Sequence, residues 1–101
     1  MENVNSVKLK QLQNEGKKLL VDFWAPWCGP CKSLIPRLEL LESKYQNVEF
    51  VKVNVDENSD LALELNIRTV PTVIIYDGKS LVERTTGANQ DIVYTKVLDK
   101  L

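Results

Sequence analysis

Histidine is absent from the sequence, and cysteine occurs only twice, at Cys28 and Cys31. A structural zinc ion usually takes four cysteine or histidine ligands, so one copy of this chain cannot supply a usual zinc site. Secreted domains held together by disulfides usually carry more cysteines, which close longer loops than this pair can. We therefore interpret the two cysteines as a reactive pair and not as a structural one.

The sequence has no marked excess of positive or negative charge, and it has no long apolar run. Its net charge is −1, so it offers no basic surface for nucleic acid or anionic lipid. The longest apolar run, residues 19–25, is interrupted by Asp22 and is too short to cross a bilayer. Because no secretion signal is recognisable either, we expect a soluble cytoplasmic protein with neither a nucleic-acid partner nor a membrane partner.

The length and composition are those of one globular domain. The chain has 101 residues, of which 44% are hydrophobic and 27% charged. We expect a single domain over residues 1–101 that works as a monomer. No glycine-rich fingerprint for a dinucleotide is present, so we expect no bound cofactor and infer that electrons reach the cysteines from another protein.

Apolar periodicity predicts alternating helices and strands. The predicted helices cover 9–12, 34–45, 61–65 and 94–101, and the predicted strands cover 19–24, 51–55, 73–76 and 81–85. Asp77 and Gly78 favour a tight hairpin turn between the last two strands, and Asn89 is a candidate cap for the last helix. This order predicts an α/β fold in which a central mixed sheet, part parallel and part antiparallel, carries helices on both faces.

The cysteine pair stands where a predicted strand passes into a predicted helix. Cys28 then occupies the cap position, and Pro30 lies in the first turn, where its missing N–H costs nothing. The free amides and the positive end of the helix dipole favour a thiolate at Cys28 over a thiol. We predict that Cys28 attacks a target disulfide and that Cys31, buried inside the turn, resolves the mixed disulfide.

The run Val21-Asp22-Phe23-Trp24-Ala25, followed by Trp27-Cys28-Gly29-Pro30-Cys31-Lys32, resembles the active-site strand and motif of the thioredoxin family. Val70-Pro71-Thr72 resembles the proline loop of that family, and the order of elements matches over nearly the whole chain. The resemblance implies the thioredoxin fold and a general protein-disulfide reductase. Its partners would be disulfide-containing target proteins and an electron donor of the thioredoxin reductase type.

The resemblance also implies roles for further residues. Pro71 would be cis and face the cysteines, and the backbone of Val70 would bind the target in extended form. Asp22, with Lys52 beside it, would be a buried carboxylate that relays protons to and from Cys31. The apolar surface that docks the target would consist of Trp27, Gly29, Pro30, Val70, Gly87 and Ala88.

The sequence departs from the family pattern at three places. Pro26 replaces the polar residue often found before the tryptophan, Asn66 stands where glycine is common, and only residues 2–5 are available for the usual first strand.

Two other functions remain open at this stage. The same cysteine chemistry could run in reverse in an oxidant or isomerase, although Gly29-Pro30 resembles the reducing members of the family. The alternative that is not a redox enzyme is a binding module, which would use the fold as a scaffold or hold an iron-sulfur cluster between two chains.

Overall fold

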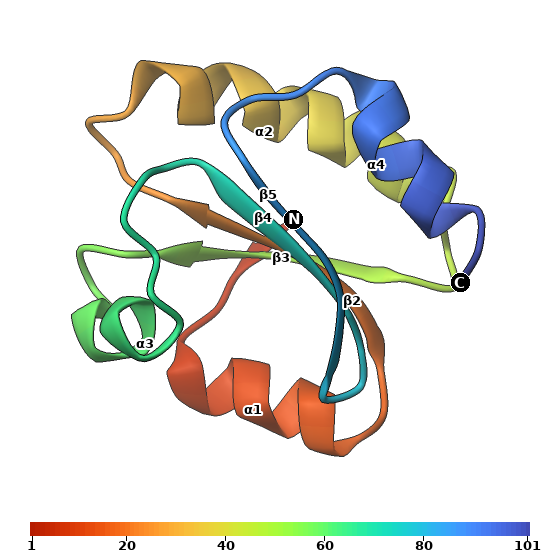
Figure 1. The fold of residues 1–101 in the computed structure, drawn as a ribbon, viewed down its shortest axis with the longest axis horizontal. Coiled ribbons are helices and arrows are strands. Elements are labelled where there is room, and N and C mark those ends of the chain that lie inside the picture. The colour runs from red at the N-terminus through yellow and green to blue at the C-terminus, as the bar shows by residue number, and fades with distance from the viewer.

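The computed structural model describes residues 1–101 and contains five strands and four helices (Figure 1). In chain order the elements are β1 (Glu2–Asn3), α1 (Ser6–Asn14), β2 (Lys18–Trp24), α2 (Gly29–Glu42), β3 (Glu49–Asn54), α3 (Ser59–Glu64), β4 (Thr72–Asp77), β5 (Ser80–Thr86) and α4 (Asp91–Leu98). Every helix and strand predicted from periodicity is present. The strand β1 is also present, but it is only two residues long.

The five strands form one mixed sheet in the order β1-β3-β2-β4-β5. The strands β1, β3 and β2 run parallel, whereas β4 and β5 are antiparallel to their neighbours. The central strand is β2. Its sequence is mostly apolar, which suits a strand that is covered on both faces. The predicted mixed sheet is therefore confirmed.

Two hydrophobic clusters fill the space on either side of the sheet. Alternate residues of β2 point to opposite faces, so Val21 packs with the leucines of α1 and α3 while Leu20 packs with those of α2. Figure 1 shows α2 and α4 on one face and α1 and α3 on the other. The prediction of helices on both faces is confirmed.

The hairpin between β4 and β5 turns one residue later than predicted. Asp77 still belongs to β4 and pairs with Ser80, so the two loop residues are Gly78 and Lys79. Only the first of them has a positive φ, 61° at Gly78, which is the pattern of a type II′ turn. The turn is tight, as expected, but Asp77 pairs as a strand residue.

The prediction that Asn89 caps α4 is wrong. The capping position is occupied by Gln90, and the side chain of Asn89 bonds backward to the carbonyl oxygens of Thr86 and Gly87. Asparagine side chains commonly make such local bonds to the backbone, which compete with capping. Asn89 therefore organises the loop that precedes α4. No helix in the structure is long and apolar enough to cross a membrane.

We predict that the two leucines Leu38 and Leu40 of α2 respond differently to truncation. Leu38 is fully buried in the cluster between the sheet and α2, whereas Leu40 is 70% exposed. Leu38→Ala should lower the free energy of unfolding by about 2–5 kcal/mol, because it leaves a cavity. Leu40→Ala, the matched control, should change it by less than about 0.5 kcal/mol. Equal effects in urea titrations of the two variants would contradict this packing.

Candidate active site

The cysteine pair lies at the junction between β2 and α2. Cys28 has an extended backbone conformation and caps α2, and its Sγ accepts a hydrogen bond of 3.2 Å from the N–H of Cys31. Gly29 begins the helix and Pro30 follows in its first turn, where a free N–H is not needed. The predicted cap position of Cys28 is confirmed.

Cys28 and Cys31 form a disulfide bond with a Cα–Cα distance of 5.3 Å. That separation lies within the usual range for disulfides, so two intervening residues in a first helical turn suffice to bring the sulfurs together. Cys28 is 5% exposed and Cys31 is 0% exposed. Any target disulfide can therefore approach the pair only from the side of Cys28.

The loop before β4 faces the disulfide. The Val70–Pro71 peptide bond is cis, as the family resemblance implies, and the carbonyl oxygen of Val70 lies 3.6 Å from Cys28 Sγ. The N–H of Gly87 donates a hydrogen bond of 2.8 Å to the carbonyl of Pro71. Segments that are far apart in the sequence thus meet beside one sulfur atom.

Asp22 is fully buried on the face of the sheet that α2 covers. It lies two residues after Leu20 on β2 and therefore shares its face, near the end of the strand that leads to the cysteines. Neither carboxylate oxygen has a hydrogen-bond partner. Burial raises the pKa of Asp22 to about 7, and the positive charge of Lys52 opposes this rise only in part.

Lys52 neighbours Asp22 in the sheet but does not form an ion pair with it. The two residues are directly paired in the parallel register of β2 and β3. The ammonium group of Lys52 lies 4.9 Å from the centre of the Trp24 ring, in a cation–π contact. Lys52 therefore lies beside Asp22 in the sheet and lowers the pKa of its carboxyl through charge. The side-chain contact that Lys52 makes is with Trp24.

Most of the residues expected to dock targets are exposed. Trp27 is 70% exposed, and its Nε1 donates a hydrogen bond of 3.0 Å to Asp56. Gly29, Pro30, Gly87 and Ala88 are exposed as well, Val70 is half-buried, and Pro71 is buried. Among these residues, Val70 contacts Cys28 directly, through its carbonyl oxygen.

A depression of about 320 Å³ extends this surface beside Trp27. It is lined by Trp27, Val55, Ile67, Arg68, Thr69 and Val70. Sequence reasoning missed Val55, Asp56 and Ile67. Val55 and Asp56 directly follow β3, and the carboxyl ends of neighbouring parallel strands meet at one edge of a sheet, so strand order was the signal that could have found them.

No three histidine, cysteine, aspartate or glutamate side chains lie together in a way that could hold a metal ion. The group available for chemistry is the disulfide itself. The two cysteines form a small buried cluster with Ala25, and Trp24, Val55 and Val70 pack against this cluster. A dithiol formed there by reduction would be largely shielded from water.

Comparison with known proteins decides the family. The family model described as thioredoxin matches residues 4–100. The chain belongs to the thioredoxin family. It is 43% identical over 86 residues to thioredoxin Asp f 28 of Aspergillus fumigatus, an overlap of 84% of this chain and 79% of that one. It is 35% identical over 97 residues to the thioredoxin of Mycoplasma genitalium, covering 95% and 92% of the two chains.

Solved thioredoxin structures share the fold over nearly the whole chain. The similarity to Plasmodium falciparum thioredoxin has a TM-score of 0.90 at 33% identity and covers 99% of this chain and 98% of that one. For Fasciola hepatica thioredoxin the TM-score is 0.88 at 33% identity, with 98% of each chain covered. The protein is thus a thiol-disulfide oxidoreductase whose redox-active group is the Cys28–Cys31 disulfide.

One departure from the thioredoxin pattern has a clear structural reason. Asn66, where glycine is common, has a φ of 57°, and asparagine tolerates this left-handed conformation better than most residues. Its side-chain oxygen accepts a hydrogen bond from Arg68 Nε, and its carbonyl accepts one from Arg84. The bond from Arg68 is a contact that glycine, which has no side chain, could not make. Nothing in the structure explains the exposed Pro26.

We predict that Asp22 makes the stability of the oxidised protein depend on pH. Between about pH 4 and pH 7 the unfolded chain ionises this residue, whereas the folded protein keeps it protonated. The free energy of unfolding should therefore fall as the pH rises through this range. A pKa raised from 3.8 to about 7 corresponds to about 4 kcal/mol.

Asp22→Asn removes the ionisation at nearly constant size. The variant should match the parent near pH 4 and exceed its free energy of unfolding by about 4 kcal/mol near pH 8, as measured by urea denaturation. Asp77→Asn, at an exposed site, is the control and should follow the parent at every pH. A stability difference between Asp22→Asn and the parent that does not change with pH would contradict a burial-raised pKa.

Proposed function

We propose that this thioredoxin-family protein reduces disulfides in other proteins, with Cys28 as nucleophile, Cys31 as resolving thiol and Asp22 as proton relay. The observation that carries the proposal is the position of the disulfide. The two nearly buried cysteines adjoin the exposed Trp27 in the chain. The carbonyl oxygen of Val70 lies 3.6 Å from Cys28 Sγ. A target can thus be bound and attacked at the same place.

The reaction transfers two electrons from the dithiol to the target. The thiolate of Cys28 attacks one sulfur of the target disulfide, and the other target sulfur leaves and takes up a proton. Cys31 then loses its proton and attacks Cys28 Sγ, which releases the second target thiol. The protein ends as the Cys28–Cys31 disulfide and the target as a dithiol, so the bonds and electrons balance.

The position of Cys28 at the start of α2 supports its role as nucleophile. The Cys31 N–H already points at Cys28 Sγ, and the first turn of a 14-residue helix presents its positive dipole end there. Both effects favour a negative sulfur. Because Cys31 lies deeper than Cys28, a bulky target disulfide can reach the sulfur of Cys28 but not that of Cys31.

The burial of Asp22 supports its role as a proton relay. A carboxyl group with a pKa of about 7 exchanges protons readily at neutral pH, whereas an ordinary aspartate is ionised and a poor base there. Asp22 lies on the sheet face that α2 covers, and the first turn of α2 carries Cys31. Lys52 tunes the charge of Asp22 from the neighbouring strand.

The exposed surface around the disulfide supports binding of an extended target segment. The backbone of Val70, next to the buried Pro71, would pair with the main chain of the target, while the exposed residues Trp27, Gly29, Pro30, Gly87 and Ala88 supply a surface with few charges. Main-chain pairing gives affinity with little demand on the target's sequence. A general reductase with many disulfide-containing targets follows from that kind of recognition.

The cycle needs a partner that returns electrons to the disulfide. We infer an electron donor of the thioredoxin reductase type, which would use the same exposed side of Cys28. In a cytoplasm the prevailing thiol pool keeps such dithiols reduced, so this compartment suits a reductant. A monomer suits the role, since one chain contains every residue of the proposed cycle.

We predict opposite outcomes for the two serine substitutions. Cys28→Ser should lower the reduction of insulin disulfides by dithiothreitol to the background rate, because the attacking sulfur is missing. Cys31→Ser should still attack and should accumulate mixed disulfides, since nothing resolves them. Non-reducing electrophoresis after mixing with insulin measures the trapped species, and the double variant is the control. Trapping by Cys28→Ser in place of Cys31→Ser would reverse the assignment.

A further inference from the structure

The loop between β5 and α4 contributes Gly87 and Ala88 to the proposed docking surface. We call residues 87–90 the docking loop. Gly87 has a φ of 84°, and its N–H bonds to the carbonyl of Pro71, which ties the beginning of the loop to the segment beside the disulfide. A single backbone bond leaves the rest of the loop to be positioned by other contacts.

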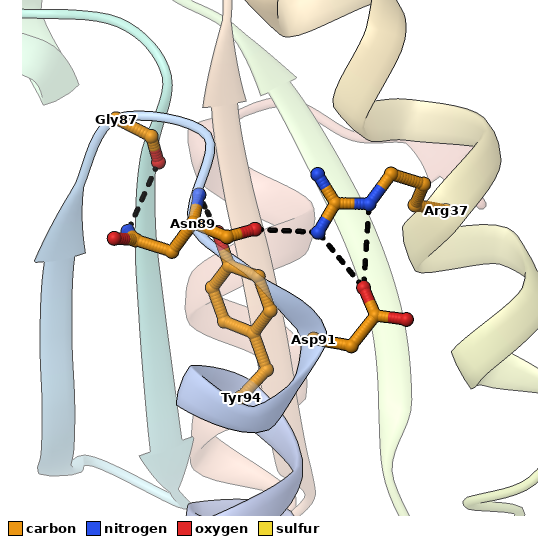
Figure 2. Close-up of polar contacts among 5 residues, drawn as sticks. All are labelled: Arg37, Gly87, Asn89, Asp91 and Tyr94. Atoms are coloured by element: carbon orange, nitrogen blue, oxygen red, sulfur yellow. Dashed lines mark hydrogen bonds and ion pairs between the residues drawn. The ribbon is translucent and has the colours of Figure 1, made fainter.

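Asn89 holds the docking loop in shape from within. Its side-chain amide donates hydrogen bonds of 3.1 and 3.2 Å to the carbonyl oxygens of Thr86 and Gly87. Its main-chain N–H donates a bond of 3.1 Å to the hydroxyl oxygen of Tyr94, which is 1% exposed. The residue therefore connects the docking loop to the buried side of α4 (Figure 2).

Arg37 reaches the same residue from α2, as Figure 2 shows. Its Nη2 donates a hydrogen bond of 2.5 Å to the carbonyl oxygen of Asn89. The Nε and Nη2 atoms also converge on one carboxylate oxygen of Asp91, at 3.3 and 2.8 Å. The planar guanidinium group can make these contacts together because its donors form a rigid fork. One side chain thus joins α2 to both the docking loop and the start of α4.

The helix that carries Arg37 also carries the disulfide. Arg37 lies six residues after Cys31 in α2, directly after Pro36, so one helix connects the two positions. The contact between Arg37 and Asn89 therefore joins the docking loop to the helix that carries the sulfur atoms. Without it, the docking loop keeps its link to Pro71 but loses its direct link to α2.

We propose that Arg37 is a positioning residue that holds the docking loop in place for protein targets, an inference that rests on the proposed function. It does not touch the reacting sulfurs and leaves their chemistry unchanged. Its contribution is confined to targets that are large enough to cover the docking loop. Small disulfides, which reach Cys28 without contacting the docking loop, do not depend on Arg37.

The test compares a protein disulfide with a small one. Reduced Arg37→Met is mixed with insulin or with hydroxyethyl disulfide, and its oxidation is followed by stopped-flow tryptophan fluorescence. The second-order rate constant for insulin should fall about fivefold, as expected for the loss of one partly exposed charge-assisted contact. The rate constant for hydroxyethyl disulfide should stay within about 1.5-fold of the value for the parent protein, since this small molecule does not contact the docking loop.

Two further variants sharpen the comparison. Asp91→Asn keeps the bond between Arg37 and the Asn89 carbonyl, so its effect on insulin should be smaller than that of Arg37→Met. Tyr45→Phe is the matched control, because the Tyr45 hydroxyl bonds to Asp99 at 2.5 Å and joins the far ends of the α2 and α4 segments. It should leave both rate constants unchanged. Equal losses with insulin and with the small disulfide in Arg37→Met would overturn the proposal.

Hydrogen exchange separates failure of this inference from failure of the proposed function. The amide of Asn89 should exchange faster in Arg37→Met than in the parent, whereas the amide of Leu38 in α2 should not change. If the parent protein fails to reduce insulin, the proposed function is wrong, and the exchange result still tests whether Arg37 holds Asn89 in place. If the parent reduces insulin but Asn89 exchange and the insulin rate are unaltered in Arg37→Met, then Arg37 does not position the docking loop.

Discussion

The passage of the chain from the central strand β2 into the helix α2 is the constraint on which the site depends. The apolar run of β2 fixes that strand in the middle of the sheet, and the chain leaves its carboxyl end to start α2 within five residues. Cys28 caps the helix, so its sulfur meets the free N–H of Cys31. Leu34, Leu38 and Leu41 then clamp the helix onto the sheet and hold both sulfurs in place.

The same strand carries a group that weakens the fold. Asp22 is buried without a hydrogen-bond partner, and a leucine or valine there would avoid the cost of an isolated carboxylate. The fold tolerates it because the surrounding apolar clusters are extensive and because the group stays largely protonated up to neutral pH. The proton relay that we propose for Asp22 would give this costly carboxyl a use unrelated to stability.

Local signals were enough to predict the strands, the helices and the position of Cys28, because hydrophobic periodicity and capping act over a few residues. The cis bond before Pro71 was reached only through the family resemblance, since it leaves no local signal. The apolar neighbours of Asp22 on both sides already favoured its burial, whereas its proposed role came from the resemblance. The contact of Lys52 with Trp24 and the bond from Arg37 to Asn89 were not predicted. Both depend on how long side chains from separate elements meet, which tertiary packing determines and sequence spacing does not.

The most direct test of the central claim is the reduction potential of the Cys28–Cys31 couple, measured by equilibration in glutathione buffers of defined composition. We expect a value near the roughly −270 mV of thioredoxin, which suits a donor of electrons to protein disulfides. A potential near about −120 mV, the value of a strong oxidant, would contradict the assignment and would mean that the protein donates its disulfide to others.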